Sequence, residues 1–238
     1  KNDYGYDNSE FYEKLEERGF FIQKESLSNY PNTEFSITSI MNMNYLDFLT
    51  KLQSEESKDM RLAQQLHKDN KVMQVFHANG YEIYSFHGNR GALSDIITKN
   101  FCKNYPDLNS QLISTLVKQY IPISTIRIEI LQAQHYEKVT CILDTMIDFE
   151  KKTDKPIYMH MHVRFPHQPL IFDSEGNKIN EPIAPNRFDS ELKDAFLQQL
   201  IFANKKIIEI VDSIKQKNPD AVIILMSDHG GRFGLSWI

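Results

Sequence analysis

The sequence predicts an α/β fold, in which helices cover both faces of a mainly parallel sheet, and three observations support this. An uninterrupted apolar run over residues 221–226 is typical of a central parallel strand that is buried on both faces. Residues 192–214 carry apolar side chains at three- and four-residue steps, which is the pattern of an amphipathic helix. Strand-like and helix-like segments alternate along the chain, and this predicts βαβ units with a parallel sheet.

The elements have recognisable start and stop signals. Asp7 and Glu10 resemble a capping box at the start of the first helix, Gly19 fits its C-terminal stop, and Asn218 with Pro219 ends the last helix. In chain order we expect a helix over residues 7–18, a short buried strand over 20–22, a helix from Thr33, a mostly helical stretch over 45–76, a strand over 81–86, one or two helices over 93–117, a helix over 134–151, a strand over 156–163, a loop over 164–187, a helix over 192–214 and the strand over 221–226.

Length and composition are those of a globular protein. A chain of 238 residues with 41% hydrophobic and 25% charged residues can bury a sizeable core, and no linker divides it, so we predict a single α/β domain over residues 1–238. We expect this domain to be incomplete at both ends, because Lys1 is not a start methionine and the chain ends just past a predicted strand. A net charge of -5 offers no basic surface, which argues against nucleic acid as a partner.

Polar residues follow the predicted strand over 221–226. Asp228 and His229 come directly after it, and Gly230 and Gly231 allow a sharp backbone turn beside them. The carboxyl ends of parallel strands are where ligands bind in open α/β sheets, and an acid with a neutral imidazole suits a divalent cation such as zinc or manganese. The alternative is a loop in which the acid caps a turn and the histidine is an exposed surface residue.

Two other stretches are expected at the same edge of the sheet. His160, His162 and His167 follow a second strand, and Thr33 begins a helix after a third. A hydroxyl beside a divalent cation is acidified and can attack, while a helix N-terminus favours an incoming anion. The histidines could bind a second metal or contact the anion and leaving group. The alternatives are that Thr33 is only an N-cap and that the histidines are ordinary strand residues.

Four blocks of the sequence carry a family resemblance. YGYDNSEFYEKLEERGFF, SLSNYPNTEFSITSIMNMNYL, HVRFPHQPLIFDSEG and ILMSDHGGRFG, in this order, resemble a bacterial sulfatase-like protein of the alkaline phosphatase superfamily. The resemblance implies a three-layer α/β/α sandwich with a mainly parallel sheet. It also implies cleavage or transfer of phosphate or sulfate esters by a hydroxyl nucleophile with a divalent metal ion, zinc or manganese first and calcium or magnesium as alternatives.

The resemblance assigns roles to particular residues. Asp228 and His229 match the metal-binding pair, and Thr33 takes the place of the catalytic, metal-bound residue of phosphoethanolamine and phosphoglycerol transferases. His162 and His167 keep the spacing of the substrate-side histidines of phosphoethanolamine transferases. Arg90 and Arg232 are further candidates for binding the anion.

Two departures from the family pattern bear on the activity. No cysteine or serine lies in the C/S-x-P-x-R stretch that sulfatases mature to formylglycine, which disfavours a specialist in sulfate esters. The resemblance also implies a further metal-ligand aspartate on a strand before the first helix, and the sequence begins after the place of that strand, so we expect the metal site of this fragment to be incomplete.

We therefore expect a metal-dependent hydrolase or transferase that acts on phosphate, or sulfate, esters through Thr33. The alternative is a catalytically inactive binding or scaffolding domain of a membrane-attached protein. The expected partner is a phosphorylated or sulfated small molecule, lipid or glycan, with membrane attachment through segments outside this chain. The resemblance favours the extracytoplasmic face of a bacterial cytoplasmic membrane, with the cytoplasm as the alternative.

Overall fold

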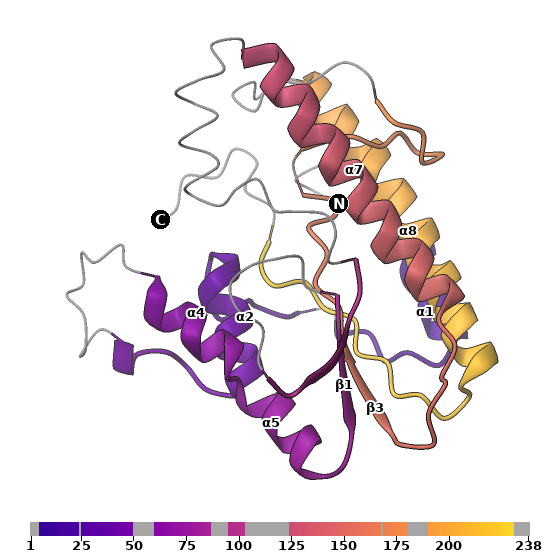
Figure 1. The fold of residues 1–238 in the computed structure, drawn as a ribbon. Coiled ribbons are helices and arrows are strands. Elements are labelled where there is room, and N and C mark those ends of the chain that lie inside the picture. The colour runs from indigo at the N-terminus through magenta and orange to yellow at the C-terminus, as the bar shows by residue number, and fades with distance from the viewer. Residues whose placement is uncertain are drawn as a thin grey trace. The chain divides into compact units, whose positions relative to one another are not determined.

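The structure is a computed structural model that describes residues 5–23, 25–49, 60–86, 95–102, 124–167, 169–179 and 190–230 (Figure 1). The chain divides into two compact units. The sheet unit comprises residues 25–101, 152–161 and 224–238, and the helical unit comprises residues 1–24, 102–151 and 162–223. The prediction of one domain over the whole chain stays a prediction.

The sheet unit is built on a parallel sheet. Its strands are β1 (Glu82–Ser85), β2 (Ile97–Asn100) and β3 (Ile157–His160), and their order in the sheet is β2-β1-β3. Both neighbours of β1 pair with it in parallel, and the register places Ser85 beside Asn100 on one side and beside His160 on the other. The polar residues at the carboxyl ends of all three strands therefore lie in one row.

Helices pack against this sheet through one apolar cluster. The helices of the sheet unit are α2 (Thr33–Asn42), α4 (Arg61–Lys68) and α5 (Lys71–Ala78). Ile37 and Met41, four residues apart on α2, are buried in one cluster with Met73 of α5 and Ile83 of β1. Residues four apart share a helix face, so this stripe of α2 packs on the sheet, and each such side chain contributes about 1.5–3 kcal/mol through burial.

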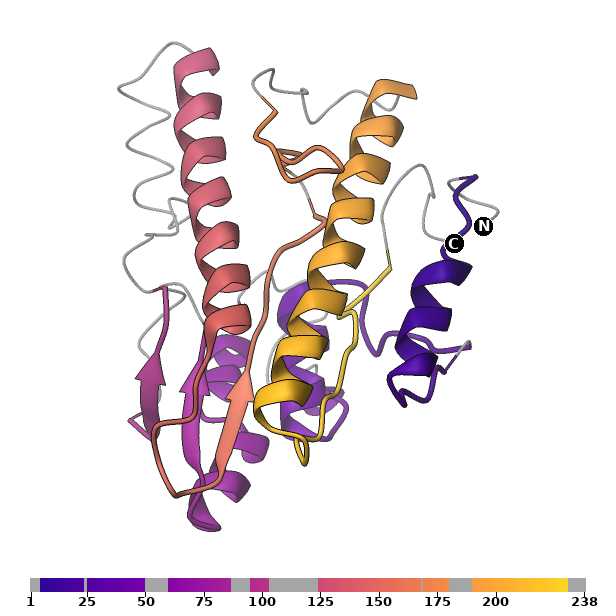
Figure 2. The same cartoon turned by 90° about the vertical axis from the view of Figure 1, so that its right-hand side faces the viewer.

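The helical unit consists of α1 (Ser9–Glu17), α7 (Ser124–Asp148), α8 (Ser190–Lys217) and the loop before α8. Figures 1 and 2 show the long helices α7 and α8 side by side, with α1 next to α8. Both long helices carry buried apolar residues, which are Val139, Ile142, Leu143 and Met146 on α7 and Leu192, Ala195, Ile210 and Val211 on α8. The guanidinium of Arg18 ties the end of α1 to α8, with hydrogen bonds of 2.6 and 2.8 Å to Asp212.

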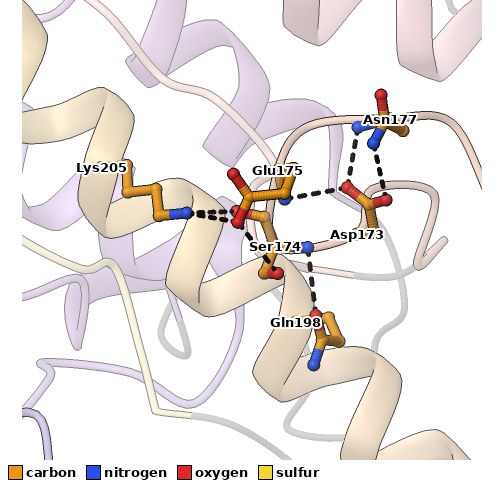
Figure 3. Close-up of polar contacts among 6 residues, drawn as sticks. All are labelled: Asp173, Ser174, Glu175, Asn177, Gln198 and Lys205. Atoms are coloured by element: carbon orange, nitrogen blue, oxygen red, sulfur yellow. Dashed lines mark hydrogen bonds and ion pairs between the residues drawn. The ribbon is translucent and has the colours of Figure 1, made fainter.

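A tight turn precedes α8 in the helical unit (Figure 3). The carboxylate of Asp173 accepts hydrogen bonds from the backbone N–H groups of Glu175 and Asn177, and Lys205 of α8 bonds to the Glu175 carboxylate at 2.7 Å. Gly176 has φ +89°, and a Cβ atom there would lie 2.5 Å from the ring of Phe202. Only glycine fits this position without displacing the ring, which fixes how the turn sits on α8.

A disulfide joins Cys102, which follows β2, to Cys141 of α7. The bond closes a sequence separation of 39 residues. The sequence offered no sign of this pairing, because two cysteines so far apart can be matched only when the fold places them together.

The α/β prediction is confirmed by a small parallel sheet flanked by helices. The expected strands over 81–86 and 156–163 correspond to β1 and β3, and the expected helices over 134–151 and 192–214 correspond to α7 and α8. The helix from Thr33 begins at that residue as predicted. The first helix is shorter than expected, and in place of a capping box Asp7 accepts a bond from the backbone N–H of Ser9.

The prediction of a central buried strand over residues 221–226 is wrong. The structure assigns no strand there, and the side chains of Val222, Ile224 and Met226 are 89%, 78% and 60% exposed. None of the described strands takes this segment as a neighbour. An apolar run becomes a buried strand only when another strand pairs with it and layers cover it, and the pattern by itself supplies neither.

Two smaller predictions are also wrong. Residues 20–22 form no strand, and Phe21 is 87% exposed. One or two helices were expected between residues 93 and 117; this is wrong for residues 97–100, which form β2, and the rest of the prediction falls largely outside the described residues. In the part of the chain that the structure describes, no helix has the length and apolarity to cross a bilayer.

Candidate active site

Thr33 is the first residue of α2, and its neighbour caps the helix. Asn32 has extended backbone angles, and its side-chain oxygen accepts a 3.0 Å hydrogen bond from the backbone N–H of Phe35. An N-cap of this kind satisfies one of the N–H groups that a helix start leaves open. The cap is therefore Asn32, and the hydroxyl of Thr33 is turned to another partner.

That partner is His229, which is 196 residues further along the chain. Thr33 Oγ1 lies 3.2 Å from His229 Nε2, and the same nitrogen lies 3.4 Å from Asp228 Oδ2. All of these residues belong to the sheet unit. The side chains of His229 and Asp228 are only 11% and 21% exposed, so a hydroxyl, an imidazole and a carboxylate converge in a partly water-shielded place.

The backbone of Gly230 sets the tautomer of His229. His229 Nδ1 lies 2.8 Å from the carbonyl oxygen of Gly230. A carbonyl can only accept, so Nδ1 carries the hydrogen, and in the neutral ring Nε2 presents its lone pair toward Thr33. The Thr33 hydroxyl then donates to His229, which is the geometry of a hydroxyl nucleophile next to a base or to a metal-ligating imidazole.

Ser36 fixes the other side of the cluster. Its side chain is fully buried, and its hydroxyl donates to the backbone carbonyl of Asp228. Ser36 stands three residues after Thr33, so both side chains lie on the same face of α2 and both contact the segment that carries Asp228 and His229. Ser36 was not among the predicted site residues, although its three-residue spacing from Thr33 indicates that the two share a helix face.

Three side chains of the cluster carry atoms that can bind a divalent cation. They are the carboxylate of Asp228, the imidazole of His229 and the hydroxyl of Thr33, and ligands of these types suit zinc or manganese. Among the described residues, no group of three or more His, Cys, Asp or Glu side chains is placed to hold a metal ion. The residues thus fit part of a metal site by ligand chemistry.

The other predicted residues are distributed differently. His162 and His167 belong to the helical unit, whereas His160 belongs to the sheet unit at the end of β3. Arg90 and Arg232 lie outside the described residues.

His135 is a further histidine that the sequence analysis did not single out. It lies on α7, and its imidazole hydrogen-bonds to the backbone of Arg164 while Nε2 is buried with no hydrogen-bond partner among the described residues. Burial, followed by the positive charge of Arg164, lowers the pKa of His135 to about 4. Lys138 and His167 act in the same direction, so the imidazole is neutral at physiological pH.

The hydroxyl, imidazole and carboxylate gathered at the start of α2 are side chains that suit hydrolytic chemistry. The chain belongs to the Sulfatase family, whose match spans residues 2–235. This confirms the sulfatase-like resemblance and the fold it implies, and it places the chain among hydrolase-type enzymes that act on sulfate and phosphate esters. Comparison with curated proteins and with solved structures gives no match.

Proposed function

We propose that this protein is a metal-dependent hydrolase or transferase of phosphate esters with Thr33 as its nucleophile. The observation that supports this most directly is the 3.2 Å contact between Thr33 Oγ1 and His229 Nε2. Because Asn32 caps α2, the Thr33 hydroxyl has no structural task at the helix start. It is available for chemistry at a point where the helix dipole favours an anion.

Each residue of the cluster has a role in the proposed reaction. Asp228, His229 and Thr33 would hold the divalent cation, zinc or manganese first and calcium or magnesium as alternatives, which would lower the pKa of the hydroxyl and offset charge on the substrate. Thr33 Oγ1, its proton released to water, would form a bond to phosphorus as the bond to the leaving oxygen breaks, and that oxygen would take up a proton from water to leave as the alcohol. Water or an acceptor alcohol then releases the phosphoryl group from Thr33.

The substrate-side assignments rest on the family resemblance. His162, His167, Arg90 and Arg232 are proposed to contact the anion. The lack of a C/S-x-P-x-R stretch favours phosphate over sulfate esters. We therefore propose a phosphorylated small molecule, lipid or glycan as substrate, with membrane attachment through segments outside this chain.

Thr33→Ala tests the nucleophile. In the full-length protein it is expected to lower turnover of a chromogenic phosphodiester by roughly 10³-fold or more, since nucleophile removal eliminates the covalent route. Bound metal, measured by elemental analysis, should fall much less, because Asp228 and His229 stay in place. The unfolding temperature should also change little, because the cap belongs to Asn32.

Thr33→Ser is the matched control, since it keeps the hydroxyl. A parallel panel of a phosphodiester, a phosphomonoester and an aryl sulfate separates phosphate from sulfate chemistry. Undiminished turnover by Thr33→Ala would contradict the proposal, and a folded wild-type protein that turns over none of the three would support the inactive scaffolding alternative.

A further inference from the structure

We infer that His160 is a further residue of this site and that its imidazole contacts the phosphoryl oxygens of the substrate. The inference rests on the proposed function for the identity of the reacting group. It follows from the row of polar residues at the carboxyl ends of the strands, from the face of the sheet on which that row lies, and from the direction of α2.

The register of the sheet places the row. Ser85 pairs with Asn100 of β2 and with His160 of β3, so the last residues of the three strands stand side by side. Side chains two residues apart on a strand share a face. Ser85 therefore lies on the same face as Ile83, and His160 lies on the same face as Tyr158.

This face is the one that α2 covers. Ile83 is buried in one cluster with Ile37 and Met41 of α2, and the hydroxyl of Tyr158 contacts Met41 Sδ at 3.8 Å. Ser85 and His160 thus continue the surface on which α2 packs, one step nearer to the carboxyl ends of the strands.

α2 runs opposite to the strands, so its first turn lies at their carboxyl ends (Figure 2). Figure 2 shows the three strands pointing toward the end of the sheet unit at which α2 begins. From Ile37 back to Thr33 the helix covers about 6 Å, and from Ile83 to Ser85 the strand covers about 7 Å. The Ser85–His160 pair is therefore level with the first turn of α2, where Thr33 meets His229.

The face of the sheet that α2 covers changes from apolar to polar at the level of Ser85. Further from the carboxyl ends of the strands, Ile37 and Met41 of α2 pack on Ile83, whereas at the level of Ser85 the fully buried side chains are those of Ser36 and Ser85. Asn100 Oδ1 is also buried and has no hydrogen-bond partner among the described residues. Because Ser36 donates to the carbonyl of Asp228, this polar level is also the level of the segment that carries Asp228 and His229.

A tetrahedral phosphoryl group suits this place. The positive end of the α2 dipole and an imidazole N–H of His160 both favour its oxygens, and the charge on those oxygens increases as Thr33 attacks. Hydrogen bonds to charged groups contribute about 1.5–3 kcal/mol, so loss of the imidazole is expected to weaken phosphate binding about tenfold to a hundredfold.

The test uses the full chain with His160→Ala and His160→Asn, and His77→Asn as the matched control on the exposed end of α5. Both His160 variants are expected to raise KM for a phosphodiester, and the inhibition constant of inorganic phosphate, by about tenfold or more. His77→Asn should change neither. In the wild-type protein, the NMR signals of the His160 ring should shift when inorganic phosphate is added, and those of His77 should not.

The two proposals fail in different ways. Unchanged KM and phosphate inhibition in a folded His160 variant, or a His160 signal that ignores phosphate, overturns this inference while leaving the role of Thr33 intact. If His160→Ala does not fold, the wild-type NMR titration still decides. Full activity of Thr33→Ala together with a phosphate-dependent His160 signal would overturn the nucleophile and keep His160 as an anion contact.

Discussion

His135 shows how strongly one buried side chain can respond to its surroundings. Its imidazole sits inside the helical unit, close enough to Arg164, Lys138 and His167 for their charges to act on it. Protonation of His135 would place a positive charge in a buried site beside these positively charged neighbours. Burial first, and then these neighbours, lower the pKa of His135 to about 4.

The stability of the protein should therefore depend on pH through His135. In the unfolded chain the imidazole takes up a proton near pH 6.5, whereas the folded protein resists protonation down to about pH 4. The unfolded state binds more protons in this window, so stability is full above it and falls as pH drops, by up to about 3 kcal/mol from this residue. Urea unfolding at pH 7.5, 6, 5 and 4 measures the loss.

His135→Gln isolates this contribution, because carboxyl groups also titrate toward the low end of the range. The variant is expected to lose less stability than the wild type between pH 7.5 and pH 4. Parallel curves for the two proteins would show that His135 is protonated in the folded state as readily as in the unfolded one.

Among the elements, α8 positions the loop before it through one buried glutamine. Gln199 is fully buried, and its side-chain oxygen accepts from the backbone N–H groups of Ile171 and Phe172 at 2.8 and 3.2 Å. Its amide nitrogen donates to the backbone carbonyls of Pro166 and His167 at 3.0 and 3.1 Å. One side chain thus bonds to four main-chain groups of a loop that has no regular structure of its own there.

Gln199→Leu is expected to lower the free energy of unfolding by roughly 3–5 kcal/mol, because it leaves those main-chain groups in an apolar interior without partners. Denaturant unfolding measures the change. Gln198→Leu is the control: Gln198 is exposed and accepts one 3.2 Å bond from Ser174 (Figure 3), so its loss should cost less than about 1 kcal/mol. Equal effects of the two variants would contradict the argument.

Helices were easier to predict than strands, for a physical reason. A helix such as α8 satisfies its backbone within itself, so apolar spacing and a stop at Asn218 nearly define it. A strand forms only when another strand pairs with it, and the sequences of residues 97–100 and 221–226 do not show whether a pairing strand lies beside them. Hence β2 was missed, and the apolar run was given a partner that the described structure does not show.

At the scale of the whole molecule, the disulfide between Cys102 and Cys141 is the one covalent cross-link. Closing a 39-residue separation stabilises a protein by about 4 kcal/mol on the chain-entropy estimate.

Replacing both cysteines by serine, Cys102→Ser with Cys141→Ser, should therefore lower the free energy of unfolding by about 4 kcal/mol. Thiol titration of the denatured wild-type protein without reductant should find no free cysteine, and with reductant it should find both. Two free thiols without reductant, together with unchanged stability of the double variant, would show that the bond does not form.

The candidate site was partly readable from the sequence. The sequence predicted that Thr33 and the Asp228–His229 pair would lie close together, and the 3.2 Å contact between Thr33 and His229 agrees, although the strand over residues 221–226 on which the prediction relied does not form. The partner of Ser36, the backbone carbonyl of Asp228, could not be predicted, since it lies 192 residues further along the chain. Such contacts become visible only when the path of the main chain is known.

The apolar stretch over residues 221–226 has a practical consequence. An extended, uncharged and water-facing tract with β-branched side chains is a template onto which another copy of the same tract can add. Among the residues that the structure describes, it is a segment where aggregation in concentrated solution is expected to begin, and Ile224→Lys is expected to slow that aggregation, which light scattering would measure.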